Sequence, residues 1–124
     1  MVAHGKFSCQ GCKHGELIRS ITFHDLARMG RIVMTAAAER SRPVVLNQNL
    51  AVVGDSVPPW LEARMGVTLA RLESARSAAL LRGTARQMAD TLQRRREVTG
   101  VSYICASVDS APLLAPVVEL LQDR

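Results

Sequence analysis

The sequence predicts an α/β fold in which two parallel strands, residues 44–53 and 101–107, are separated by a helical crossover. The first strand is indicated by a run dense in valine and leucine between Pro43 and Gly54. The second is indicated by the Val-Ser-Tyr-Ile-Cys run that follows Gly100. The long stretch between the two runs has helical periodicity, and strands joined by such a crossover pair in parallel.

Length and composition fit one globular domain. The chain has 124 residues, of which 48% are hydrophobic and 22% are charged, values typical of soluble globular proteins. No run approaches the ~18 apolar residues of a membrane span, and the start has no apolar stretch of the secretory type. Three cysteines, an odd number, favour reduced thiols over a disulfide framework. We therefore expect a cytoplasmic protein without a membrane association.

The basic balance of the chain raises the question of nucleic acid binding. Sixteen Lys and Arg residues against eleven Asp and Glu residues give a formal net charge of +5, and basic domains bind DNA or RNA through their charge. Here the charges are spread along the predicted helices, and aromatic residues, which stack on bases, make up only 3% of the chain. A solvated, mildly basic surface is the favoured interpretation, and nucleic acid is not an expected partner.

The chain is predicted to begin with an irregular leader, residues 1–20, followed by a helix over residues 23–40. The leader has little apolar periodicity. Thr22 followed by Asp25 is a variant of the capping box that begins helices. Gly30 inside the helix costs about 1 kcal/mol relative to Ala, a cost that packing must offset. Four apolar residues recur at helical spacing and are assigned to the buried side: Leu26, Met29, Val33 and Ala37.

Alternation along residues 44–53 assigns two faces to the first strand. Asn47 and Asn49 point to the same side, and apolar residues occupy both sides towards the end of the run. This pattern predicts a sheet that is covered on both faces, as parallel sheets are. The other face carries Val44, Leu46, Leu50 and Val52, interrupted by Gln48.

Helices are predicted for the crossover. A short helix over residues 60–64 ends at Gly66, and a second short helix follows it. The longest helix starts at Thr84 and ends at Gly100, where a left-handed residue is expected. Its arginine-rich end is stabilised by the helix dipole. Its buried side is assigned to Ala85, Met88, Ala89 and Leu92, and its outer face or last turn to Arg86, Gln93, Arg94, Arg95 and Arg96.

The chain closes with the strand over residues 101–107 and a last helix. Pro116 lacks an amide donor, so the regular part of that helix is predicted for residues 116–122. Its buried side is assigned to Val117, Val118, Leu120 and Leu121.

Four potential metal ligands lie within eleven residues of the leader: His4, Cys9, Cys12 and His14. A CxxC pair is half of a structural zinc site. No second pair follows, so an irregular leader without a metal is the expectation. A redox CxxC would open a helix after a strand, and that context is absent here.

Three further side chains, His24, Tyr103 and Cys105, are of types that can carry chemistry. His24 falls in the first turn of the first helix and is expected at the surface. Cys105 has no paired base in the sequence, which favours a buried thiol over a nucleophile. Tyr103 is expected to pack as an aromatic residue, with a role in lining a cavity as the alternative. The sequence indicates no particular residue as catalytic.

Four stretches of the chain resemble segments of one enzyme family. They are TFHDLARMGRIVMTAAAER, VVLNQNLAVV, LEARMGVTLARLESARSAALLRGTARQMADTLQRRREVTGVSYICAS and APVVELL. Together, from about Ile21 to Arg124, they resemble the C-terminal part of luciferase-like monooxygenases, which are oxidoreductases that use FMN or the deazaflavin coenzyme. The combination of the Gly-Thr start, the arginine-rich helix end and the Gly-Val-Ser-Tyr strand is the most specific part of this resemblance.

The resemblance implies that residues 21–124 form a partial (β/α)8 TIM barrel, its last two β/α units. A complete barrel has ~250 residues, so we expect a truncated domain without the early strands and without the glycine-rich phosphate-holding turn. Asn47, Asn49 and Ser107 are the implied cofactor-binding residues. The two asparagines are equally well explained as amides at the edge of a core, which need hydrogen-bond partners too.

Two functions follow as hypotheses. In the complete family, hydride is transferred to or from a bound flavin or deazaflavin, but two strand ends cannot enclose both a flavin-type ring and a substrate. The alternative is a non-catalytic module, because half a barrel exposes sheet edges and apolar faces. It predicts a homo-oligomer or a complementing barrel chain as the partner. A third reading of the charge, a small nucleic-acid binder, predicts salt-sensitive retention of DNA or RNA.

Overall fold

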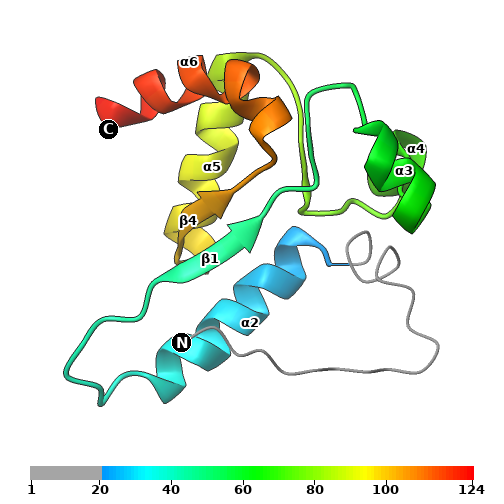
Figure 1. Ribbon diagram of the computed structural model, residues 1–124. Coiled ribbons are helices and arrows are strands. Elements are labelled where there is room, and N and C mark those ends of the chain that lie inside the picture. Colours follow the sequence, from blue (N-terminus) through cyan, green and yellow to red (C-terminus); the bar gives the residue numbers. More distant parts are fainter. Residues whose placement is uncertain (1–20) are drawn as a thin grey trace.

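A computed structural model describes residues 21–124 and confirms the α/β class, with helices and short parallel strands (Figure 1). The elements follow one another as α2 (Phe23–Ala36), β1 (Leu46–Asn49), β2 (Val52–Val53), α3 (Pro59–Met65), α4 (Leu69–Ser74), β3 (Leu80–Leu81), α5 (Ala85–Thr99), β4 (Val101–Cys105), the 3₁₀ helix η1 (Val108–Ser110) and α6 (Ala111–Gln122).

The strands form two parallel pairs. β1 pairs with β4, so that Asn47 lies opposite Tyr103 and Asn49 opposite Cys105. β2 pairs with β3, which places Val52 opposite Leu80. The predicted parallel pairing of the two strand regions is therefore confirmed, over a shorter length than the sequence indicated.

The prediction of one continuous strand over residues 44–53 is wrong, because the chain bends between β1 and β2. The amide of Leu50 donates to the carbonyl of Cys105 at 2.8 Å, whereas the amides of Ala51 and Val52 both donate to the carbonyl of Ala79. The chain thus changes its partner strand at this bend. β3 was not predicted, since two residues are too few to show an alternating pattern.

Two hydrophobic cores lie on the two sides of β2. Val53 joins a core formed with α5 and α6, which includes Leu81 and Val117. Val52 joins a second core under α3 and α4, which includes Leu61 and Leu72. Side chains of consecutive strand residues point to opposite faces, so β2 is covered on both faces, as its sequence pattern indicated.

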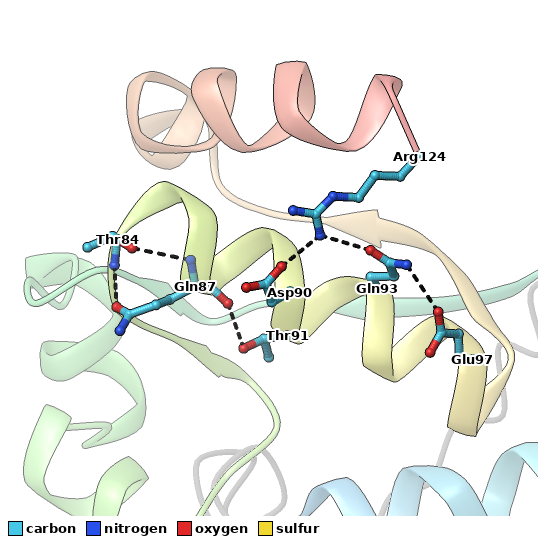
Figure 2. A network of polar contacts seen from close by, with 7 residues as sticks. All are labelled: Thr84, Gln87, Asp90, Thr91, Gln93, Glu97 and Arg124. Carbon is cyan, nitrogen blue, oxygen red and sulfur yellow. Dashed lines mark hydrogen bonds and ion pairs between the residues drawn. The ribbon is translucent and has the colours of Figure 1, made fainter.

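The α5 helix forms as the sequence predicted, and Figure 2 shows the contacts at its beginning. The Gln87 amide donates to the Thr84 hydroxyl at 3.2 Å, and the Thr84 amide donates to Oε1 of Gln87 at 2.8 Å. This reciprocal pair is a capping box. Gly100 ends the helix in the left-handed conformation, with φ of 78°. The predicted buried side is confirmed, with Met88 and Ala89 fully buried.

The end of α6 is tied to the outer surface of α5 (Figure 2). Nη1 of Arg124 donates to Oδ1 of Asp90 at 2.7 Å and to Oε1 of Gln93 at 2.8 Å. The α6 helix also packs along α5. Its position on α5 is therefore held both by this packing and by the contacts of Arg124 at its end.

The α2 helix has the predicted capping box at Thr22 but a different buried side. It ends at Ala36, not at residue 40, and its buried residues are Ala27 and Gly30. Met29 is 47% exposed, contrary to its assignment to the buried side. Val33, of the same predicted stripe, is also exposed. The reason is that α2 packs on α5 with Gly30 close against the main-chain carbonyl of Thr99, which turns this side of α2 inward.

The α6 helix begins at Ala111, earlier than Pro116 led us to expect. Pro116 lies inside the helix, where the only bond it removes is the one to the carbonyl of Pro112 in the first turn. Val117 is fully buried as predicted, whereas Val118 is half exposed, contrary to the prediction.

Candidate functional site

The β1–β4 pair has helices on one face and solvent on the other. On the helix face, Gln48 is buried and Ile104 packs against the core of α5 and α6. On the other face, Asn47 and Asn49 are exposed beside Tyr103, which is 57% exposed. We call this second surface, formed by Asn47, Asn49, Tyr103 and Cys105, the open face. In Figure 1, α5 lies behind the two strands.

The prediction of a sheet covered on both faces, as parallel sheets usually are, is therefore wrong for the β1–β4 pair, whose open face is exposed to solvent. The side chains of the open face are polar or amphipathic, and two of them are amides with donors and acceptors to offer. The open face is therefore the candidate site, in the form of an exposed surface and not an enclosed cavity.

The strand pair is held from the helix side by a polar network. Nε2 of Gln48 donates to the carbonyl of Ala78 at 2.7 Å. Nη1 of Arg95 donates to the same carbonyl at 2.8 Å and to Oε1 of Gln48 at 3.3 Å. The amide that interrupts the apolar face of β1 is thus satisfied, and it links β1 to α5 and to the segment before β3.

The expectation that Arg95 lies on the outer face or in the last turn of α5 is wrong, since its side chain is only 6% exposed and the basic residue of the last turn is Arg96. Burial lowers the pKa of its guanidinium below the ordinary value. A signal for this burial exists in the sequence: position 95 continues the buried stripe of Met88 and Leu92 at helical spacing, and Thr99 follows it. The arginine-rich composition of the helix end concealed that periodicity.

The structure places two of the three predicted cofactor-binding residues together. Asn47 and Asn49 share the open face, as their alternation indicated. Ser107 lies beyond β4 and begins η1. The Ser107 hydroxyl accepts a hydrogen bond from the amide of Asp109 and donates one to Oδ2 of Asp109 at 3.3 Å. This hydroxyl therefore caps the beginning of η1.

The remaining candidates have mixed outcomes. His24 is exposed, as expected of a surface histidine. Tyr103 does not pack in a core, contrary to the expectation, and Cys105 is only partly buried. His4, Cys9, Cys12 and His14 lie outside the described residues. Within residues 21–124, no group of three or more His, Cys, Asp and Glu side chains is placed to hold a metal ion.

Comparison of the chain with protein-family models, with curated proteins and with solved structures finds no match. In the part of the chain that the structure describes, no helix combines the length and the apolar character that crossing a bilayer requires.

Proposed function

We propose that this chain is the terminal part of a luciferase-like oxidoreductase domain, and that its open face lines the interior of that domain. The observation that carries the proposal is the one-sided cover of the β1–β4 pair: α5 lies on one face, and Asn47 and Asn49 are exposed on the other. In a (β/α)8 barrel, helices form the outer ring and the opposite faces of the parallel strands point inward. The sequence resemblance over residues 21–124 supports the same assignment.

The open face suits one side of a flavin or deazaflavin ring. The amides of Asn47 and Asn49 can both donate to and accept from the polar edge of such a ring, and Tyr103 offers an aromatic surface. Two strands do not enclose a ring, so the other half of the site belongs to further strands or to another chain. When bound in the complete domain, the cofactor supplies the hydride-transfer chemistry. The residues of this chain contribute contacts to one side of the cofactor ring.

The two proposed barrel strands are neighbours in the structure. Residues 44–53 and 101–107 would be consecutive strands of the barrel, and consecutive barrel strands lie side by side. β1 pairs directly with β4, and the two-residue strand β3 pairs with β2 and does not enter between them.

The test is a fluorescence titration of the purified chain with FMN and, separately, with the deazaflavin coenzyme. The expected result is a saturable change in cofactor fluorescence that disappears when Asn47 and Asn49 are both replaced by leucine. Gln122→Leu, which removes an exposed amide at the end of α6, is the matched control and should bind as the unmodified chain does. If neither cofactor binds, the cofactor contacts do not reside in this chain.

The second candidate is a non-catalytic module that associates with itself or with a complementing barrel chain. It is favoured by apolar side chains that α2 exposes to solvent in addition to the open face: Met29, Ile32, Val33 and Met34. Exposed apolar patches and uncovered strands are typical of interaction surfaces. Sedimentation equilibrium over a wide concentration range tests this candidate, and a monomer throughout would count against self-association.

A further inference from the structure

We propose that a groove along α5, which shares no residue with the open face, binds a phosphate-bearing small molecule through Arg94 and Arg95. The groove has a volume of about 1010 Å³ and is open to solvent. Small-molecule sites commonly have volumes of ~300–1,000 Å³. Besides the two arginines, Phe23, Asp55, Arg82 and Asp90 border it.

The carboxylates of the groove are already paired. Oδ1 of Asp55 accepts from Nε of Arg82 at 2.7 Å. Oδ1 of Asp90 is 2.7 Å from Nη1 of Arg124. Across residues 21–124 no carboxylate forms an ion pair with Arg94 or Arg95. The groove therefore carries an excess of positive charge at these two neighbouring positions.

Within residues 21–124, Arg95 is a buried cation whose hydrogen-bond acceptors are all neutral. Its guanidinium donates to Oε1 of Gln48, to the carbonyl of Ala78 and to the carbonyl of Leu80. Its Nε is buried and has no hydrogen-bond partner among the residues that the structure describes. An arginine side chain stays protonated in proteins, and a buried charge is costly unless an opposite charge pairs with it. A bound anion would supply that charge.

The chemistry of the groove favours phosphate over other anions. A guanidinium has a planar fork of donors that matches the oxygens of a phosphate group, and Arg94 can offer this fork. Arg95, whose Nη1 already donates to Gln48 and Ala78, adds its positive charge. Arg94 is exposed and can meet an incoming ligand, whereas Arg95 lies deeper. The ring of Phe23 gives an apolar contact for an organic group attached to the phosphate.

Inorganic pyrophosphate, titrated by isothermal calorimetry at constant ionic strength, is the probe that tests this proposal. The unmodified chain is expected to bind it saturably, and its thermal midpoint should rise with ligand concentration. Arg94→Gln should weaken the affinity about tenfold. Arg86→Gln is the matched control, because Arg86 is exposed on the same helix but does not border the groove.

Arg95→Met tests the deeper arginine, and Arg94→Gln keeps the test decisive if the Arg95 variant does not fold. The proposal is overturned if pyrophosphate does not bind saturably. It is equally overturned if Arg86→Gln and Arg94→Gln weaken binding to the same extent, which would indicate a non-specific effect of charge. Flavin binding at the open face has no bearing on either result, because Asn47 and Asn49 do not border the groove.

Discussion

Gly30 of α2 lies against the main-chain carbonyl of Thr99 at the end of α5, so closely that a Cβ at position 30 would overlap the carbonyl oxygen. This contact explains why a glycine is placed in the middle of a helix. It also positions the chain at Gly100 and Val101, where β4 begins. The packing of α2 on α5 thereby supports the strand pair that carries the open face.

Replacing Gly30 by alanine should destabilise the protein by about 1–3 kcal/mol, because the added methyl group forces the two helices apart. In an open position the same change would stabilise a helix by about 1 kcal/mol. The free energy of unfolding, measured with urea, shows whether Gly30→Ala destabilises or stabilises the protein. Met34→Ala on the exposed side of α2 is the control and should change stability by less than about 0.5 kcal/mol. An increase in stability for Gly30→Ala would contradict the close packing.

The capping box of α5 should contribute measurably to the free energy of unfolding. Thr84→Ala removes the hydroxyl that accepts from the Gln87 amide, and loss of such a cap costs about 1 kcal/mol. The matched control is Thr91→Ala, the same change inside the same helix, where alanine has the better helix propensity. Urea unfolding of the two variants should therefore rank Thr84→Ala as clearly the less stable. Equal stabilities would argue against the cap.

Two neighbouring valines of α6 test the packing of this helix on the core. Val117 is fully buried and Val118 is 51% exposed. Val117→Ala should cost about 1–3 kcal/mol through lost burial and the cavity left behind, and Val118→Ala less than about 0.5 kcal/mol. Thermal unfolding distinguishes the two. A larger loss of stability for Val118→Ala than for Val117→Ala would mean that another side of α6 packs on the core.

Lowering the pH should destabilise the first turn of α2. The backbone hydrogen bond from Thr22, followed by the one from its hydroxyl, lowers the pKa of the Asp25 carboxyl below its ordinary value. A carboxyl whose folded-state pKa is lowered contributes stability above its unfolded pKa of ~3.9, and this contribution is lost as pH falls through the folded-state pKa. Stability curves from neutral pH to pH ~3 should fall less steeply for Asp25→Asn than for the unmodified chain. Parallel curves would refute the role of Asp25.

The sequence predicted those elements whose signals are local. The caps at Thr22 and Thr84 and the left-handed residue at Gly100 depend on a few neighbouring residues, and the structure has all three. The parallel pairing of β1 and β4 also followed, because a helical crossover permits little else.

What the sequence did not predict depends on contacts between distant segments. β3 exists because its backbone meets β2, and the burial of Arg95 depends on Gln48 and the carbonyl of Ala78. The stripe that includes Met29 looked like a buried side, yet the close contact at Gly30 turned another side of α2 inward. Of the candidate site, the shared face of Asn47 and Asn49 was predictable from alternation, whereas the exposure of Tyr103 was not.

The most direct test of the open face as a cofactor surface is nuclear magnetic resonance of the chain labelled at asparagine. Asn47 and Asn49 are the only asparagines in the sequence, so their two side-chain amides report on this surface alone. Addition of FMN or the deazaflavin coenzyme should shift both amide signals saturably. If both signals stay unmoved while the chain remains folded, the open face does not bind the cofactor, and the account is contradicted.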